Sequence, residues 1–256
     1  MRKAYISIAA LLLCGSMLMA QTPANRTAKT TAADVLAQMP AAKQAAYNKL
    51  IGDLSSTGEE GVLMLVNMIN APGKGSNANV DYALSGLTHY VMAKGEENAR
   101  LVTAKAYLKA LEMVNERETK AFIIRQLQML GKDECIDVLA SYLNDESLSG
   151  PAARALASNG SQKAGQALVA ALKSRTGSSK TQKDVIRAIT DARVDGAEPV
   201  LLVLQGASDP NMQKEVLYAL SCVGSSNSLP VLAKAAENAG YTMEVTGANE
   251  ADRKSV

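Results

Sequence analysis

Pairs of aliphatic residues twelve positions apart recur along this chain of 256 residues. In each pair the first residue closes a helix-like apolar stretch, a short polar or glycine-containing turn follows, and the second residue lies in another such stretch. The pairs are Leu50 with Val62, Leu127 with Leu139, Leu156 with Leu168, Ile189 with Leu201, and Leu220 with Leu232. A further unit begins at Leu87, with Ala99 at the twelfth position and Leu101 after it. Each helix pair can bury its apolar side only against its neighbours, so the pattern predicts a stacked array.

The repeat length is irregular, because the first residues of successive pairs lie 37, 40, 29, 33 and 31 positions apart. Helical-hairpin solenoids show such irregular periods more often than strictly periodic arrays do. A glycine in each of five turns is expected to end the first helix in a left-handed conformation: Gly58, Gly131, Gly160, Gly196 and Gly224. No stretch alternates with period two for long enough to be a strand. We therefore predict an all-α chain, an α-solenoid of about six helical hairpins in a right-handed superhelix.

Local signals place the individual helices. Pro40 is predicted to open the first long helix, which runs to about Leu54, and Asn77 or Asn79 to cap the helix that carries Leu87. The later first helices are expected over residues 115–130, 149–157, 181–190 and 209–223, the last one capped by Asp209 ahead of a proline. Residues 71–77 and 174–180 are rich in turn formers and are interpreted as solvated connections, with recognition loops as the alternative.

The N-terminus has the order of a secretory signal peptide: Arg2 and Lys3, a mostly apolar stretch from residue 5 to residue 19, and a small residue, Ala20, at the cleavage point. An uncleaved anchor and a lipoprotein attached through Cys14 are the alternatives, the latter with a poor lipobox because Leu13 precedes the cysteine. We expect a periplasmic or secreted protein with no membrane span after removal of residues 1–20.

Removal of the signal also changes the charge balance. The chain has 27 Lys and Arg against 25 Asp and Glu, and without Arg2 and Lys3 the numbers are equal. No clustered basic face is left to indicate nucleic-acid binding. Two cysteines remain, Cys135 and Cys222. They lie three repeats apart, far beyond the Cα separation of about 7 Å that a disulfide allows. We expect two buried, helix-borne thiols.

The second helices after the turns, Gly131 to Leu139 and Gly224 to Leu232, resemble HEAT repeats of the short, phycobilisome-lyase-like type, most clearly over residues 115–240. This resemblance implies a curved surface for macromolecular contact, with a protein partner. The chain is also similar, more faintly, to the HEAT-like region that precedes a β-sandwich domain of the 3-keto-disaccharide hydrolase type in secreted bacterial proteins. That similarity implies a carbohydrate-active partner or domain, with the sugar chemistry outside this chain.

The organisation predicted from these signals is a signal peptide over residues 1–20, an N-terminal segment or capping helix over 21–39, the repeat array over 40–240 and a charged tail over 241–256. After Gly240 the sequence shows no polar helix to cover the last apolar stripe, as a solenoid requires. We therefore interpret the chain as a shortened product, or the descendant of a longer array.

Few residues suggest catalysis. His89 is eight positions from Asp81, about 12 Å along a helix, too far for an oriented catalytic pair, so a surface histidine is expected. No Cys-x-x-Cys or His-x-x-x-His spacing indicates a metal site, and no cofactor is implied. Gly73-Lys74-Gly75-Ser76 lacks the order of a phosphate loop and is interpreted as linker. The acid pairs at predicted helix starts are assigned to helix dipoles: Glu59 with Glu60, Glu96 with Glu97, and Glu116 with Glu118.

Three arginines occupy the same place in consecutive repeats, two positions before the first anchor: Arg125, Arg154 and Arg187. Such a row can receive an acidic partner, but its position about 160° from the buried anchor favours a solvated outer face. The mature tyrosines are expected to be mostly core or near-core: Tyr47, Tyr82, Tyr90, Tyr107, Tyr142, Tyr218 and Tyr241. The sequence thus predicts a non-catalytic module for protein interaction or scaffolding, with no binding residue assigned. The alternative is the helical part of a larger secreted carbohydrate-active hydrolase.

Overall fold

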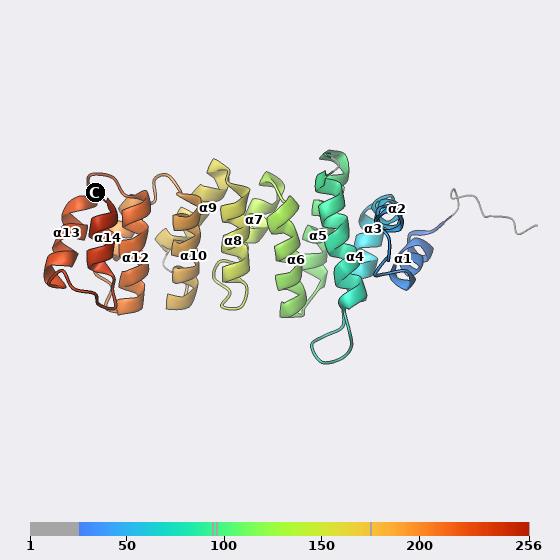
Figure 1. Ribbon diagram of the computed structural model, residues 1–256, viewed down its shortest axis with the longest axis horizontal. Coiled ribbons are helices and arrows are strands. Elements are labelled where there is room, and N and C mark those ends of the chain that lie inside the picture. Colours follow the sequence, from blue (N-terminus) through green and yellow to red (C-terminus); the bar gives the residue numbers. More distant parts are fainter. Residues whose placement is uncertain (1–25, 94, 96, 175, 256) are drawn as a thin grey trace, which may run out of the picture.

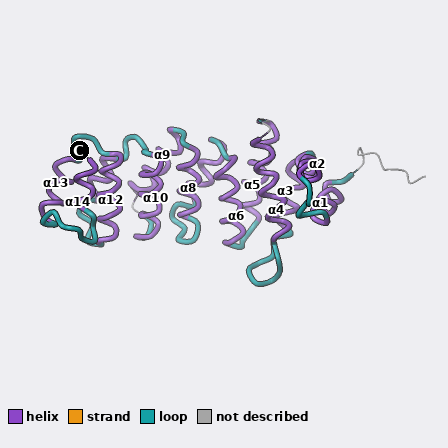
Figure 2. The backbone as a smooth tube through the Cα atoms, viewed as in Figure 1, coloured by secondary structure: helices purple, strands orange, loops and turns teal. Residues whose placement is uncertain are grey.

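The computed structural model describes residues 26–255 apart from residues 94, 96 and 175. Within these residues the chain is all-helical, with fourteen α-helices and no strand, as Figure 2 shows. This confirms the predicted all-α class. The predicted signal peptide, its cleavage at Ala20 and Cys14 lie outside the described residues.

The helices alternate between two sets along the chain. The odd-numbered set is α1 (Ala28–Ala37), α3 (Gly58–Asn67), α5 (Glu97–Met113), α7 (Ile136–Ser141), α9 (Gln162–Ser174), α11 (Glu198–Leu204) and α13 (Leu229–Asn238). The even-numbered set is α2 (Gln44–Ser55), α4 (Ala78–Ala93), α6 (Arg117–Leu130), α8 (Ser149–Asn159), α10 (Ser179–Ala192), α12 (Pro210–Val223) and α14 (Ala248–Ser255). A 3-10 turn, η2 (Asp133–Cys135), precedes α7.

Each set forms its own layer. Every even-numbered helix from α2 to α14 packs against the next even-numbered one, while α1, α3 and α5 pack in sequence, as do α7, α9 and α11. Helices that follow each other in the chain also contact across the two layers, as α8 does with α9. Figure 1 shows the result as an elongated array that follows chain order until α13, with α14 folded back beside α12 and α13. A long core between two layers of helices follows from this arrangement.

The twelve-residue pairs explain why the layers meet. All ten members of the five complete pairs are buried, the most exposed being Leu50 at 7%. The first member of each pair lies in an even-numbered helix and the second in the following odd-numbered helix, for example Leu156 in α8 and Leu168 in α9. Leu87 is buried in α4 and Ala99 is half-buried in α5. The six pairs therefore correspond to six hairpins, from α2–α3 to α12–α13.

The predicted helix starts are confirmed for α3 at Gly58, α8 at Ser149 and α12 after Asp209, and the start predicted for the first long helix is wrong. Asp209 caps α12 by accepting a hydrogen bond from the backbone N–H of Asn211 at 3.0 Å. By contrast, α2 begins at Gln44 rather than at Pro40, and residues 38–43 connect it to α1. The α1 helix lies inside the predicted N-terminal segment and packs against α2 and α3.

The cap predicted for α4 is replaced by a closed loop. The side chain of Asn77 faces back to Asn70, accepting from its backbone N–H at 2.8 Å and donating to its carbonyl oxygen at 3.0 Å. The side chain of Asn79 donates to the carbonyl oxygen of Leu36 at 3.4 Å instead. Ser76 Oγ accepts from the backbone N–H of Ala78, the first residue of α4, at 3.3 Å. The loop over residues 71–77 is thus closed at its base.

The turn glycines fall into two groups. Gly58, Gly160 and Gly196 have the predicted left-handed backbone, with φ between +60° and +75°. Gly131 and Gly224 do not, because their φ values are −72° and −74°. There a Cβ would lie 2.6 Å from the carbonyl oxygen of Leu127 or 2.3 Å from that of Leu220. At these two turns glycine is needed for close backbone approach and not for its left-handed freedom.

The charged tail contains a helix, so the prediction that no helix covers the end of the array is wrong. Residues 248–255 form α14, which packs against both α12 and α13. Its only buried apolar side chains among the described residues are Ala248 and Ala251, one turn apart. Two alanines in eight residues are too weak a pattern to indicate a helix from sequence. Glu244 precedes the helix and accepts from the backbone N–H of Ala248 at 3.2 Å.

Candidate binding surface

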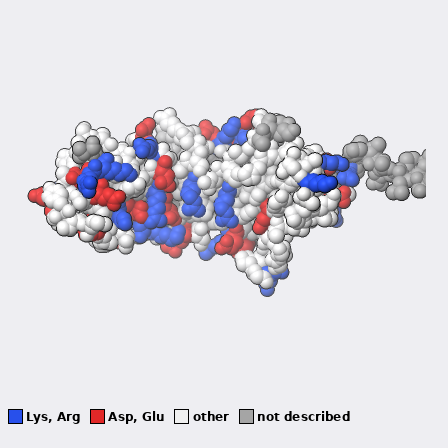
Figure 3. Space-filling view, in the orientation of Figure 1, with Lys and Arg blue, Asp and Glu red and all other residues white. Residues whose placement is uncertain are grey.

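The arginine row (Arg125, Arg154 and Arg187) lies on the open face of the even-numbered layer. Its members are exposed and belong to α6, α8 and α10, three consecutive helices of that layer. Figure 3 shows basic side chains over each of these helices on one face of the molecule. Each arginine is two residues before a buried anchor, which turns it away from the core. The predicted outward position of the row is confirmed.

Only one member of the row has an ion-pair partner. Arg187 binds Glu215 of α12 with its Nε at 3.0 Å and also with Nη2. These hydrogen bonds raise the pKa of the Arg187 guanidinium, against a smaller opposing effect of burial. Within the described residues, Arg125 and Arg154 make no hydrogen bond or ion pair through their side chains. Two exposed guanidinium groups are therefore available on neighbouring helices.

Asp184, an acid near the arginine row, already accepts hydrogen bonds from other residues. Asp184 of α10 accepts a hydrogen bond from Ser149 Oγ at 2.6 Å and one from Lys180 Nζ at 2.9 Å. A methyl group at Gly150 would lie 3.4 Å from Nη1 of Arg154 and 3.5 Å from Oδ2 of Asp184, so this carboxylate is close to the second arginine without bonding it. Burial raises the pKa of Asp81, and the charge of Arg125 partly opposes that rise.

A hollow of about 180 Å³ lies beside Arg125, between the closed loop and α6. Apolar groups of Ile69, Pro72 and Phe122 line it together with the side chain of Asn77 and the carboxylates of Asp81 and Glu118. The loop over residues 71–77, for which recognition was the alternative reading, thus borders the arginine row. No sequence pattern predicts this juxtaposition, because the loop ends 40 residues before α6 begins.

The other charged candidates have structural surroundings. His89 is an exposed residue of α4, as expected. Glu59 binds Lys109 of α5, and Glu97 binds Arg100 and Lys132. Glu96 lies outside the described residues. No three His, Cys, Asp or Glu side chains lie close enough together to hold a metal ion in the part of the chain that the structure describes.

The tyrosines and cysteines differ in part from expectation. Tyr107 is fully buried, and Tyr47, Tyr90 and Tyr142 are half-buried, but three others are exposed: Tyr82 at 43%, Tyr218 at 45% and Tyr241 at 61%. Cys135 and Cys222 are free thiols. Burial raises the pKa of Cys135 to about 12, which leaves it protonated and unreactive. Cys222 is only half-buried and accepts a hydrogen bond from Lys254 Nζ at 3.2 Å.

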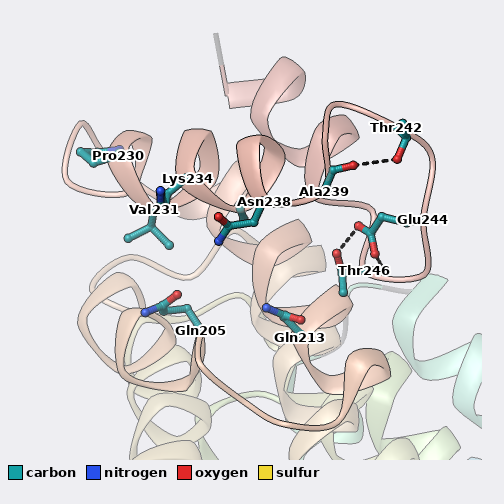
Figure 4. A pocket seen from close by; sticks show the side chains of 11 residues that line it. Gln205, Gln213, Pro230, Val231, Lys234, Asn238, Ala239, Thr242, Glu244 and Thr246 are labelled. Atoms are coloured by element: carbon teal, nitrogen blue, oxygen red, sulfur yellow. Dashed lines mark hydrogen bonds between the residues drawn. The ribbon is translucent and has the colours of Figure 1, made fainter.

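A second hollow, of about 670 Å³, lies at the C-terminal end between α13, the start of α12 and the segment before α14. Figure 4 shows Gln205, Gln213 and Asn238 around it. The side-chain amides of these three residues make no hydrogen bond in the described structure, while the carboxylate of Glu244 accepts hydrogen bonds from Thr246. An open hollow of this kind offers hydrogen-bond donors and acceptors but no aromatic face for a sugar.

The chain was compared with known proteins on the basis of its sequence. No protein-family model and no curated protein matches it. The surface must therefore be interpreted from its own chemistry. Among the described residues, no helix has the length and apolar character needed to cross a membrane.

Proposed function

We propose that this chain is an exported repeat module of the HEAT type that binds a protein partner and is not catalytic by itself. The arginine row is the observation that supports this function most directly. A guanidinium on each of three neighbouring helices forms a continuous feature across repeats, and two of the three make no hydrogen bond or ion pair in the described part of the chain. Exposed arginines are among the residues most enriched where proteins bind one another.

Export is proposed from the N-terminal order of charged, apolar and small residues. Intact-mass measurement of the protein recovered from the periplasm tests it. Loss of residues 1–20 is the expected result. A mass that corresponds to retention of Met1, or to a lipid on Cys14, would replace it with one of the two anchored alternatives.

Partner binding is tested by chemical cross-linking in periplasmic extract and identification of the cross-linked protein. The variant to compare with wild type is Arg125→Glu/Arg154→Glu, which reverses two charges on the even-numbered layer. The matched control is Lys105→Glu/Lys173→Glu, which makes the same charge change on exposed lysines of α5 and α9 in the other layer, neither of which makes an ion pair in the described structure. We expect one protein to be lost with the first variant and kept with the control. Equal capture by all three forms would argue against this face.

The rival proposal is that the chain is the helical part of a larger secreted carbohydrate-active hydrolase. It rests on the fainter of the two resemblances. A neighbouring reading frame that encodes a β-sandwich domain would favour this rival. Turnover of a glycoside by the purified chain would contradict both proposals, because each treats the helical array as non-catalytic.

A further inference from the structure

We propose that the helical array bends at the contact between α4 and α6, and that an ion pair of Asp81 with Arg125 holds it in a closed form. In the structure these two side chains line the same hollow, of about 180 Å³, without bonding to each other. The structure is therefore the open form. The bending concerns the shape of the array and does not depend on what the chain binds.

The contact between α4 and α6 is the weakest between successive even-numbered helices. These two helices contact each other less extensively than any other such pair. A long hydrogen bond, 3.4 Å from Gln126 Nε2 to Ser85 Oγ, joins them. Between α8 and α10, by comparison, Ser149 Oγ donates to Asp184 Oδ2 at 2.6 Å. Bending should therefore occur between α4 and α6 rather than elsewhere in this layer.

Unfilled space lies near both ends of α4. One end has the hollow beside Asp81, which α6 also lines, and the other has a hollow of about 250 Å³ that Met92 of α4 and Met129 of α6 line together. Asp81 and Met92 are eleven residues apart, or about 16 Å along the helix axis. Side chains normally fill the space between packed helices. The two hollows leave room for α4 and α6 to approach each other.

Polar groups without partners favour this approach. Gln126 Oε1 is buried and accepts no hydrogen bond, the one such side-chain atom in the described part of the chain. Asp81 is half-buried, and burial raises the pKa of its carboxyl while the charge of Arg125 opposes that rise. A partly desolvated carboxylate is stabilised by a direct pair with a guanidinium. Glu118 also lines the hollow, but it belongs to α6 as Arg125 does, so a pair between those two would not draw α4 toward α6.

The contact between α5 and the end of α6 supplies a fixed point for the bending. Arg100 of α5 is buried, and its Nη1 donates to the carbonyl oxygen of Leu130, the last residue of α6, at 2.7 Å and to Glu134 of η2 at 2.6 Å. Asp81, by contrast, lies in the first turn of α4. Closing therefore rotates α1–α5 toward α6 about the Arg100 contact without separating the two hairpins.

Distances between spin labels test the bending with the purified full chain. One pair of labels, at Lys49→Cys in α2 and Met129→Cys in α6, lies on either side of the bending contact. The control pair, at Met129→Cys and Asp191→Cys in α10, spans the same number of even-numbered helices in the other direction, and all three sites are exposed. Double electron–electron resonance should show two distances for the first pair, at least about 2 Å apart, and one for the control pair.

Variants of Asp81 and Arg125 identify the ion pair as the cause. Asp81→Asn and Arg125→Gln should each lower the ratio of the shorter to the longer distance about fivefold. The charge exchange Asp81→Arg/Arg125→Asp should restore the shorter distance. Every protein also has Cys14→Ser and Cys222→Ser, so that only the introduced cysteines are labelled, because Cys135 is buried.

Three results would overturn the proposal. A single distance for the first pair, unchanged in Asp81→Asn, would show that the array does not bend between α4 and α6. Two distances for both pairs would show that bending is not confined to this contact. Two distances that Asp81→Asn leaves unchanged would show that the array bends without this ion pair.

Closing also changes the arginine row, a consequence that rests on the proposed function. In the closed form Asp81 occupies Arg125, so a partner must compete with that ion pair. Asp81→Asn should therefore increase capture of the partner in the cross-linking experiment, whereas Glu118→Gln, the matched control at the same hollow, should not. Unchanged capture together with loss of the shorter distance would contradict this consequence and leave the bending intact. Absence of any captured partner would contradict the proposed function without affecting the distances.

Discussion

Arg100 contrasts with the arginines of the row because it is turned inward. It is 6% exposed and is held between the two layers, with Nη1 donating to the carbonyl oxygen of Leu130 at 2.7 Å and to Glu134 at 2.6 Å. Its Nε and Nη2 bind Glu97. This one side chain joins α5 to the turn between α6 and α7. The same residue type thus stabilises the array at one position and is free for a partner at others.

Replacing Arg100 with methionine should lower the free energy of unfolding by about 3 kcal/mol. The methionine keeps part of the apolar stem, but the carbonyl oxygen of Leu130 and the carboxylate of Glu134 lose a buried partner. Urea denaturation followed by circular dichroism measures the difference.

Lys132→Met is the matched control, because Lys132 binds the same Glu97 from a position where both side chains are 59% exposed. An exposed pair of this kind contributes less than about 1 kcal/mol. Equal losses in the two variants would show that the burial of Arg100 does not matter for its contribution.

The same cluster predicts a pH dependence. Hydrogen bonds from Arg100 and then Lys132 lower the pKa of Glu97 from 4.5 to about 2. Burial raises the pKa of Glu134, but the hydrogen bonds from Arg100 and from backbone amides outweigh it and leave the pKa below its ordinary value. Since both carboxyls bind protons less readily in the folded chain, their contribution to stability is present above pH 4.5 and is lost as the pH falls toward 2.

Unfolding free energies measured at several pH values between 5 and about 2.5 should therefore decline more steeply for the wild type than for Arg100→Met. Other carboxyls with lowered pKa values, such as Glu198 and Asp209, are present in both proteins and cancel in the comparison. Parallel curves would contradict the assignment of the shift to Arg100.

At the scale of the single element, the glycine turns separate two physical reasons for the same residue. Alanine at Gly131 or Gly224 should lower the free energy of unfolding by about 1–3 kcal/mol. Its Cβ meets a backbone carbonyl oxygen that cannot move without displacing the helix end. Gly206→Ala is the control: no atom lies within 4 Å of the added carbon, and the change should stay within about 0.5 kcal/mol. Thermal and urea unfolding of the three variants measure these losses of stability.

The two crowded turns share one further contact. The Cβ would also meet the residue four positions on, Cys135 after Gly131 and Ser228 after Gly224, at 2.9 Å and 2.5 Å from its Sγ and Oγ. These turns begin the two equivalent segments over residues 131–139 and 224–232. A loss of stability at Gly131 with none at Gly224 would contradict the view that the two turns are built alike.

The sequence was informative where burial has a period and silent where contacts are between distant residues. The pairs of aliphatic residues twelve positions apart predicted six hairpins. The two members of a pair lie on either side of a turn and both face the core, as Leu127 and Leu139 do. The end of the array was missed, because α14 buries only Ala248 and Ala251. The outward direction of the arginine row followed from helical geometry. The ion pair of Arg187 with Glu215 and the hollow beside Arg125 depend on how neighbouring repeats are placed against each other. No pattern in a single sequence specifies that placement.

At the scale of the molecule, polar contacts repeat along the array as the apolar ones do. Side chains in one hairpin bind the equivalent region of the next, about one repeat further on in sequence. Examples are Gln128 with Ser158, Ser149 with Asp184, Ser179 with Asp209, and Ser225 with Glu198. Such contacts are made between neighbours, so stability should depend on each hairpin and its adjacent interfaces.

This dependence predicts that damage stays local. Leu65 of α3 and Leu232 of α13 are fully buried at opposite ends of the helical array. Alanine at either position should lower the local free energy of unfolding by about 2–5 kcal/mol. Helix α3 packs mainly against α1, α2, α4 and α5, whereas α13 packs mainly against α12 and α14. Hydrogen exchange read by mass spectrometry should therefore show lost protection in α1–α5 for Leu65→Ala and in α12–α14 for Leu232→Ala.

The double variant tests whether the array unfolds hairpin by hairpin or as one cooperative unit. If hairpins interact only with their neighbours, the exchange pattern of Leu65→Ala/Leu232→Ala should be the sum of the two single patterns, with α7–α9 still protected. A compact domain that unfolds as a whole would instead lose protection everywhere in either single variant. Protection that survives in the middle of the array would also keep α6 and α8 folded, so the proposed cross-linking through Arg125 and Arg154 should persist when both ends are weakened.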